Sequence, residues 1–321
     1  MMQKIRLWAS FFRVWNLAIL ALMLVLFYQY IIVPNHINQL YTKLLPLTNF
    51  DFALFVLSVV LVAAAGNIIN DYYDYDLDSE YKPHRALPQG LVSLNTAFYL
   101  HAAFAIVGIC MGFYLGYGYG VSQAGYVYIL ATLLLYLYAA YLKKIVFVGN
   151  LVVALLTTMP LLLLFLFELK FLGTVQFEFT PRVSGVLRNA VIFYAGFAFL
   201  TNLAREIVKD IEDKKGDEQH GIKTIAVQYG EMVAKLMAAL VLLIMLAALC
   251  YFMKGFWDMN AMKEFFYLLA LIVMPTGIVI ALLFTANSEK QLALVSVLLK
   301  IIMLFGILSM VAFYYFNLPN A

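Results

Sequence analysis

The hydrophobic pattern of the chain consists of long apolar runs separated by short polar segments. A membrane-spanning helix needs about 20 consecutive, mostly apolar residues. Nine runs meet that length, at 12–33, 51–70, 94–116, 121–142, 146–168, 187–204, 233–253, 264–285 and 292–316. The pattern therefore predicts an all-α membrane protein with nine transmembrane helices, folded as a single polytopic domain over 1–321 with halves of about 1–145 and 146–321.

Composition supports the membrane assignment and narrows the chemistry. The chain is 65% hydrophobic and 12% charged, whereas a soluble domain is about one quarter charged. Both cysteines lie in apolar runs and the four histidines follow no metal-binding spacing, so neither a disulfide framework nor a cysteine or histidine metal site is expected. A net charge of +3 spread over the chain gives no reason to expect a nucleic-acid partner, and membrane lipids are the expected surroundings.

Basic residues in short loops indicate the orientation, because cytoplasmic loops are enriched in Lys and Arg. With a cytoplasmic N-terminus, the inside segments hold more than twice as many bases as the outside segments. The inside set is Lys4, Arg6, Arg13, Lys82, Arg85, Lys143, Lys144, Arg205, Lys209, Lys214, Lys215, Lys223 and Lys290, and the outside set is Lys43, Lys170, Arg182, Arg188, Lys254 and Lys263. We therefore expect an integral protein of the cell (inner) membrane whose N-terminus faces the cytoplasm.

Two acid-rich stretches end the second and sixth spans and share one spacing. The first contains Asn67, Asp71, Asp74 and Asp78, and the second contains Glu206, Asp210, Asp213 and Asp217. Both sets advance by 4, 3 and 4 residues, with an offset of 139 at every position. Four spans separate the stretches, so both run in the same direction and, by the orientation above, end at the cytoplasmic face. The pattern predicts two parallel repeats, each ending in an acidic helix end.

The acidic positions also share one helix face, at about 100° per residue. Carboxylates gathered on one face repel each other and need cations, and oxygen-only ligands suit a hard ion such as Mg²⁺. Bases in the neighbouring loops, among them Arg85 and Lys143, would complete a diphosphate site. One alternative is a pair of solvated helix ends. Another is ion pairing with lysines of the same stretches, but the first stretch has no base between Asn67 and Glu80.

Several segments of the sequence resemble motifs of a known family, the UbiA-type intramembrane prenyltransferases. "NDYYDYDLD" and "KDIEDKKGD" resemble its two aspartate motifs, "FFRVWN" resembles its first-span motif, and "YLKKIVFVGNLVVALL" resembles the loop and start of its fifth span. "KPHRALPQG" resembles its proline-containing loop, with Ala86 and Gln89 as departures. Within the family, "REIVKDIED" and "GIKTIAV" are most similar to digeranylgeranylglyceryl phosphate synthases.

The resemblance implies nine helices around a central cavity and Mg²⁺ held on an allylic diphosphate by the two acidic helix ends. The metal ligands would be Asp71, Asp74, Asp78, Asp210, Asp213 and Asp217. The catalytic residues would be Asp71, Asp74, Asp210, Asp213 and Lys143. Substrate binding would involve Arg13, Asn16, Asn67, Asn70, Arg85, Tyr138, Tyr141, Lys144, Lys209 and Lys223.

The expected reaction is transfer of a prenyl group from a long allylic diphosphate, here geranylgeranyl diphosphate, to a hydrophobic acceptor. The acceptor expected from the resemblance is a glycerol phosphate ether, geranylgeranylglyceryl phosphate. Prenylation of an aromatic acceptor is the alternative within the family. An ion-coupled transporter is the alternative of another class, although transporter sites lie near the bilayer midplane and these acids lie at helix ends. A non-catalytic lipid or divalent-ion binder also remains open.

Overall fold

The computed structural model describes residues 2–39, 46–174 and 180–317. Within these ranges the chain forms helices and no strands, and nine helices are long and apolar enough to cross a membrane. They are Val14–His36, Asn49–Tyr73, Leu94–Gly118, Gln123–Ala140, Val148–Thr174, Gly185–Glu212, Glu231–Asp258, Met262–Thr285 and Glu289–Phe316. The predicted all-α class and nine spans are confirmed.

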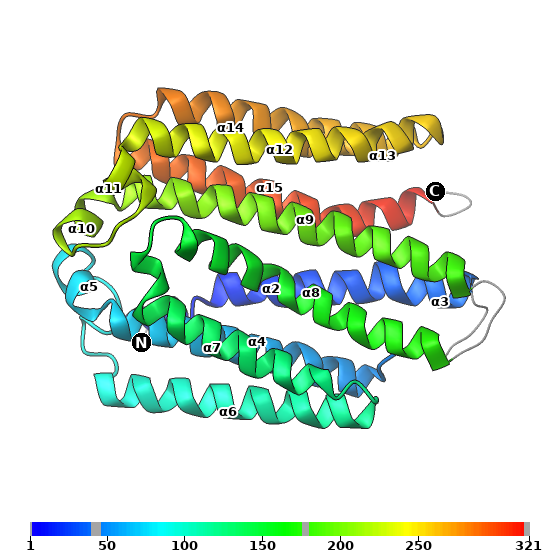
Figure 1. Ribbon diagram of the computed structural model, residues 1–321, viewed down its shortest axis with the longest axis horizontal. Helices are drawn as coiled ribbons and strands as arrows, with labels where there is room; N and C mark the ends of the chain where they lie inside the picture. The colour runs from blue at the N-terminus through cyan, green and yellow to red at the C-terminus, as the bar shows by residue number, and fades with distance from the viewer. Residues whose placement is uncertain (1, 40–45, 175–179, 318–321) are drawn as a thin grey trace. The chain divides into compact units, whose positions relative to one another are not determined.

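The longer helices can be followed by their labels in Figure 1. In the first part of the chain the helices are α1 (Met2–Phe11), α2 (Val14–Phe27), η1 (Tyr28–Ile32), α3 (Val33–Gln39), α4 (Asn49–Tyr73), α5 (Tyr75–Tyr81), α6 (Leu94–Gly118), α7 (Gln123–Ala140) and η2 (Leu142–Lys144). In the second part they are α8 (Val148–Thr174), α9 (Thr180–Glu212), α10 (Lys214–Gln219), α11 (Ile225–Tyr229), α12 (Glu231–Asp258), α13 (Met262–Leu268), η3 (Leu269–Val273), α14 (Met274–Thr285) and α15 (Glu289–Phe316).

The chain divides into two compact units, each with its own packing. Unit 1 comprises Met1–Val25, Val33–Lys143 and Met159–Arg188, and unit 2 comprises Leu26–Ile32, Lys144–Thr158 and Asn189–Ala321. The predicted halves met near residue 145, and one boundary of the units falls at Lys143. The single polytopic domain stays a prediction.

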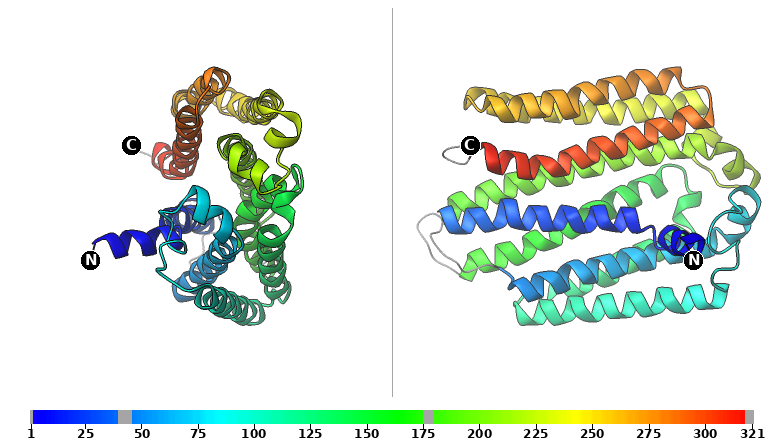
Figure 2. Two further views of the ribbon diagram at one scale, coloured as in Figure 1. Left: turned by 90° about the vertical axis from the view of Figure 1, so that its left-hand side faces the viewer. Right: turned by 180° about the vertical axis from the view of Figure 1, so that it is seen from behind.

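In unit 1, α4, α6 and α7 pack against one another, and the left view of Figure 2 shows them as neighbours, seen along their lengths. Small residues permit the close approach that membrane helices use to associate. A Cβ at Gly112 of α6 would lie 2.3 Å from the ring of Tyr128 on α7. The Tyr128 hydroxyl is hydrogen-bonded at 2.6 Å to that of Ser58 on α4. This three-helix contact holds α4 in place along much of its length.

In unit 2, α9 and α15 run antiparallel. Tyr194 on α9 is hydrogen-bonded to Ser309 on α15 at 3.0 Å, and Phe197 packs against Gly306, where a Cβ would lie 2.2 Å from its ring. At the other end of the pair, Lys215 just beyond α9 contacts Glu289 at the start of α15, at 2.9 Å. These contacts fix which residues of the two helices lie level with each other.

Both acidic stretches bend at the same place in their spacing. α4 ends at Tyr73 and α9 ends at Glu212, and the next residues, Asp74 and Asp213, have φ −89°, ψ 2° and φ −88°, ψ 2°. Each of these aspartates is followed by a short helix, α5 or α10. The polar ends therefore continue beyond the spans with matching backbone geometry at an offset of 139 residues. The larger duplication stays a prediction.

The nine long apolar helices among the described residues identify the chain as an integral membrane protein. Its orientation stays a prediction. Lys43, one of the bases used for it, lies outside the described residues, and the side chains of Lys4 and Arg182 are likewise outside them.

Candidate active site

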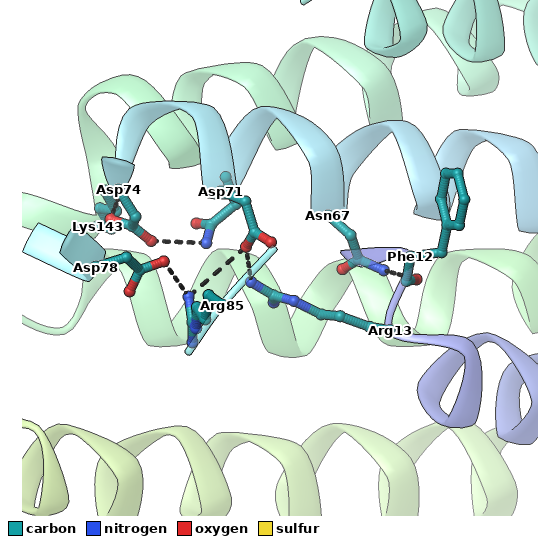
Figure 3. Close-up of polar contacts among 9 residues, drawn as sticks. Phe12, Arg13, Asn67, Asp71, Asp74, Asp78, Arg85 and Lys143 are labelled. Carbon is teal, nitrogen blue, oxygen red and sulfur yellow. Dashed lines mark hydrogen bonds and ion pairs between the residues drawn. The ribbon is translucent and has the colours of Figure 1, made fainter. Parts of the chain in front are cut away.

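The first acidic stretch forms a centre in unit 1, which we call the α4 centre: Asp71, Asp74 and Asp78 with Arg13, Arg85 and Lys143 (Figure 3). Arg13 donates to Asp71 Oδ1 at 2.7 Å, and Arg85 donates to Asp78 Oδ2 at 2.5 Å while its Nη1 lies 3.7 Å from Asp71 Oδ1. Lys143 donates to Asp74 Oδ1. Each aspartate is thus paired with a base, and the predicted Asp71, Asp74, Asp78, Arg85 and Lys143 meet.

Arg13 reaches this centre from a strained backbone position. It lies at the break between α1 and α2 with φ 53°, a left-handed conformation that disfavours any residue with a Cβ by about 1–2 kcal/mol. Next to it, Asn67 Nδ2 donates to the carbonyl of Phe12 at 3.2 Å. The strained turn is therefore tied to α4, and it directs the guanidinium at Asp71 one turn further along.

Arg85 reaches the centre from a turn between α5 and α6. The turn is closed by backbone bonds from Arg85 N to Lys82 O at 2.9 Å and from Leu91 N to Ala86 O at 3.0 Å. Ala86 and Leu87 are buried in a cluster with Phe11 and Ile68. Ala86, a departure from the family loop, is therefore an anchoring residue that fixes the position of its neighbour Arg85.

Burial and charge act in opposite directions on the α4 centre. Burial raises the pKa of the Asp78 carboxyl above its ordinary value, and the positive charge of Arg85 only partly opposes that rise. For Arg13, burial lowers the pKa of the guanidinium, but the carboxylate of Asp71 outweighs it and the net shift is upward. Asn70 Nδ2 adds a donor to Asp74 Oδ2 at 2.8 Å. The centre is compact and charge-balanced.

The pairing differs from the ion-pairing alternative considered from the sequence. That alternative used lysines within the acidic stretches themselves. The three bases of the α4 centre instead lie 58, 7 and 69 residues from their partners Asp71, Asp78 and Asp74. Tertiary packing brings bases to this stretch from three segments outside it.

The second acidic stretch forms a different centre in unit 2, which we call the α9 centre: Glu206, Asp210, Asp213 and Asp217. Asn150 of α8 donates to Asp210 Oδ2 at 2.8 Å. Glu206 is buried and accepts from Arg205 Nη1 at 2.7 Å. Asp213 and Asp217 lie partly exposed at α10. The charge of Asp210 interacts with those of Glu206, Asp217 and Lys209, so Glu206, Asp210 and Asp217 lie near one another in unit 2.

The remaining predicted residues lie around these centres. Tyr138 is half-buried and close enough to Arg13 to interact with its charge. Tyr141 caps α7 and is 64% exposed. Asn16, Lys144 and Lys223 have exposed side chains, and Asn16 contributes a backbone bond to Arg13 O at 2.8 Å. Their substrate roles stay predictions.

Two residues that bond to the acids of the α9 centre, Asn150 and Arg205, were not among the predicted site residues. Asn150 stands at the start of the fifth span, within the quoted loop "YLKKIVFVGN", where an amide beside an apolar run was a usable signal. Arg205 was counted only as a loop base that indicates orientation, and its contact with Glu206 is a product of local side-chain geometry. Sequence spacing indicated the acids but not these partners.

The described residues contain no group of three His, Cys, Asp or Glu side chains arranged to hold a metal ion. The chemistry of the α4 centre nevertheless fits a hard divalent cation, because Asp71, Asp74 and Asp78 offer only oxygen atoms. Each of these carboxylates has a base as its present partner. A divalent cation bound to the carboxylates would replace the bases as their partner. The side chains of the bases could then bind an anion.

Comparison with known proteins identifies the family. The UbiA prenyltransferase family matches residues 40–305. The chain belongs to this family. A digeranylgeranylglyceryl phosphate synthase from Methanosarcina mazei is 34% identical over 265 residues, which cover 82% of each chain. The expected family is confirmed, and the protein is a prenyltransferase enzyme of the membrane.

Two solved structures share the fold. One comes from a structural study of digeranylgeranylglyceryl phosphate synthase in membranes. It is 24% identical to this chain with a TM-score of 0.61, and the match covers 96% of this chain and 98% of that one. The other, a UbiA homolog from Archaeoglobus fulgidus bound to GPP and Mg²⁺, is 16% identical with a TM-score of 0.57 and covers 94% and 99%. The prenyltransferase thus has the fold of a protein that binds a prenyl diphosphate with a divalent metal.

Proposed function

We propose that the prenyltransferase transfers a geranylgeranyl group from geranylgeranyl diphosphate to the free hydroxyl of geranylgeranylglyceryl phosphate, with Mg²⁺ as cofactor. The observation that carries the diphosphate site is the α4 centre, where three carboxylates each hold a base. The name of the Methanosarcina relative supports the acceptor. The metal-bound fold neighbour supports the cofactor.

The α4 centre supplies both signs of charge that a metal diphosphate requires. Oxygens of Asp71, Asp74 and Asp78 would hold the cation, with Asn70 in support, and the α9 centre offers Asp210, Asp213 and Asp217 for the same purpose. When bound, Mg²⁺ neutralises the diphosphate and so makes it a better leaving group. Arg85 and Lys143, freed from their carboxylates, donate hydrogen bonds to phosphate oxygens and stabilise the charge that develops on them.

The reaction then exchanges one carbon–oxygen bond for another. The bond from the allylic carbon to the diphosphate breaks, and both its electrons leave with the diphosphate. The acceptor hydroxyl oxygen bonds to the allylic carbon, and its proton is taken up by the released diphosphate. Aromatic faces stabilise a cation by about 0.5–2 kcal/mol each, and we assign this role to Tyr138, which is half-buried and interacts with Arg13.

The function is tested with purified protein in lipid nanodiscs. Geranylgeranyl diphosphate is offered with geranylgeranylglyceryl phosphate, and separately with a hydroxybenzoate, in Mg²⁺ or in chelator. We expect ether product and released diphosphate only with the glycerol phosphate and only in Mg²⁺. Product with the hydroxybenzoate alone would move the protein to the aromatic-acceptor branch of the family.

Variants link the reaction to the proposed centre. Asp74→Asn should nearly abolish transfer, because it removes a carboxylate charge from the α4 centre. Asp76→Asn is the matched control, since Asp76 is two residues away and exposed, and it should keep near-normal activity. Equal activity in both variants would remove the α4 centre from the mechanism.

We also propose that both acidic centres face the cytoplasm, from the distribution of Lys and Arg in the loops. The test uses single cysteines in a background without Cys110 and Cys250, which are exposed. Cysteines at Lys82 and Lys215 should react with a membrane-impermeant reagent only from the cytoplasmic side. A cysteine at Met259, 71% exposed at the other end of α12, should react only from the opposite side, and the reverse pattern would invert the topology.

A further inference from the structure

Lys300 is a charged residue within a membrane span, and neither acidic centre includes it. It is the twelfth residue of α15 (Glu289–Phe316), roughly 16 Å from the start of the helix at 1.5 Å per residue. Charged side chains at such depth are rare and usually mark a functional site. Lys300 is half-buried. It forms no hydrogen bond or ion pair with any other residue in the described part of the chain.

The charges nearest Lys300 do not compensate it. The two that interact with it most strongly are the positive charges of Arg205 and Lys209, and the negative charges of Glu206 and Glu212 act more weakly. Counting Lys300 itself, three basic side chains therefore meet two acidic ones, an excess of one positive charge. A group of like charges in a weakly solvated environment is stabilised by an anion.

The packing of α9 against α15 places Arg205 at the level of Lys300. Tyr194 meets Ser309, and Phe197 meets Gly306, so each step toward the C-terminus of α9 matches a step back along α15. Eleven residues on from Tyr194 is Arg205, and eleven residues back from Ser309 is Leu298. Lys300 lies about half a turn from Leu298 along α15. The backbone positions of Arg205 and Lys300 are thus level, on neighbouring helices of unit 2, and the Lys300 ammonium interacts with the charge of Arg205.

Arg205 also has a donor that lacks an acceptor. Its Nη1 donates to Glu206 at 2.7 Å, whereas its buried Nε has no hydrogen-bond partner among the described residues. A buried donor without an acceptor is destabilising, and native proteins rarely keep one without a functional reason. Asp210, five residues further along α9, accepts from Asn150 instead. The Arg205 Nε–H is therefore available to an oxygen of a ligand.

We propose that Arg205 and Lys300 form an anion subsite that binds the phosphate group of the acceptor lipid, an inference that rests on the proposed function. The subsite lies deeper than the aspartates of the α9 centre: Arg205 precedes Asp210 by five residues, or roughly 7.5 Å along the helix. An anion that carries its own hydrocarbon chain can reach this depth from the lipid. A guanidinium that presents several N–H donors, together with an ammonium, suits the three oxygens of a phosphate monoester.

The subsite separates acceptor binding from donor binding. The donor diphosphate is assigned to carboxylates and bases at the helix ends, whereas Arg205 and Lys300 lie within the spans. Loss of Lys300 should therefore weaken binding of the phosphorylated acceptor and leave the donor unaffected. A neutral acceptor should gain nothing from either base.

The decisive variant is Lys300→Met, which removes the charge but keeps a long apolar side chain in the span. We expect the KM for geranylgeranylglyceryl phosphate to rise about 10- to 100-fold, the range of a charged hydrogen bond, with the KM for the diphosphate changed less than about twofold. Lys300→Arg should restore most of the affinity. Lys290→Met, an exposed lysine on the same helix, should behave as wild type.

Direct binding gives a readout that does not depend on turnover. Calorimetry without donor would compare the phosphorylated glycerol ether with the same ether lacking its phosphate. Wild type should prefer the phosphorylated ether about 10-fold or more, and Lys300→Met should lose that preference. Arg205→Lys, which keeps the charge beside Glu206 but removes the guanidinium donors, should retain part of it.

Each result decides a different question. If wild type prefers the phosphorylated ether and Lys300→Met keeps that preference, the subsite is wrong while the proposed function stands. A rise in donor KM instead would assign Lys300 to the diphosphate. A Lys300→Met defect seen in anionic nanodiscs but absent in zwitterionic ones would assign the residue to bulk lipid headgroups. If wild type binds neither ether and prenylates another acceptor, the proposed function and the subsite both fail.

Discussion

The α4 and α9 centres have the same acid spacing and the same backbone bend, but different partners. At corresponding positions, Asp71 accepts from the guanidinium of Arg13, whereas Asp210 accepts from the neutral amide of Asn150. The α4 centre is balanced by three bases from three segments. In the α9 centre, Glu206 is paired with its own neighbour, Arg205. A repeated spacing therefore fixes the backbone and the acids, while the partners are supplied separately in each unit.

This difference in partners indicates different roles for the two centres. A centre rich in bases can exchange them from carboxylate to phosphate, so the α4 centre is suited to the donor diphosphate. Asp210 is held by an amide rather than by a base, and its oxygen-only side chain is suited to a hard metal ion. Substitutions at corresponding positions of the two centres test these roles.

The largest expected effect comes from Asp71→Asn and Asp210→Asn, which occupy corresponding positions 139 residues apart. If both centres serve the metal diphosphate, each substitution should lower kcat/KM about 100- to 1,000-fold, the range for removing one electrostatic stabiliser of a transition state. Steady-state kinetics in saturating Mg²⁺ measures the effect. A large loss in only one variant would restrict the reaction to that centre.

A smaller and unequal effect is expected from the partners of those two acids. Arg13→Met removes a cation from Asp71 and should lower kcat/KM about 100-fold, whereas Asn150→Leu removes only a neutral donor from Asp210 and should lower it about 10-fold. Arg6→Met, an exposed base on α1, should leave kinetics unchanged. If Asn150→Leu were as damaging as Arg13→Met, the amide and the base would have equivalent roles.

The smallest effect concerns stability against pH in metal-free buffer. The pKa of Asp78 is raised in the folded state, chiefly by burial, so the folded protein binds more protons than the unfolded chain above the ordinary aspartate pKa. Its contribution to the free energy of unfolding is therefore greatest at low pH and declines as pH rises through the interval up to the raised pKa. Asp78→Asn should flatten this slope in melting-temperature measurements.

Asp217→Asn provides the comparison for that measurement. Asp217 occupies the corresponding position in unit 2 but is partly exposed, whereas Asp78 is buried. Because Asp217 is the more exposed of the two, we expect Asp217→Asn to change the pH slope less than Asp78→Asn does. An equally flattened slope in both variants would mean that burial of Asp78 is not its source.

The sequence alone determined the fold class and the positions of the acids. A run of about 20 apolar residues predicts a span without reference to any other part of the chain, and all nine predicted spans match helices of the structure. The acid spacing was equally readable, because helix geometry is set by hydrogen bonds between residues four apart. Arg85 and Lys143 were found because they lie in short loops next to spans.

Only the tertiary structure decided which groups meet. The pairs Arg13–Asp71, Lys143–Asp74 and Asn150–Asp210 join residues 58, 69 and 60 positions apart, and no local pattern encodes such distances. The level at which Arg205 and Lys300 lie on α9 and α15 likewise depends on how Phe197 packs against Gly306. Backbone hydrogen bonds within a helix are local and therefore legible in sequence. Side-chain partners depend on the packing of helices distant in the chain, and they appear only once that packing is formed.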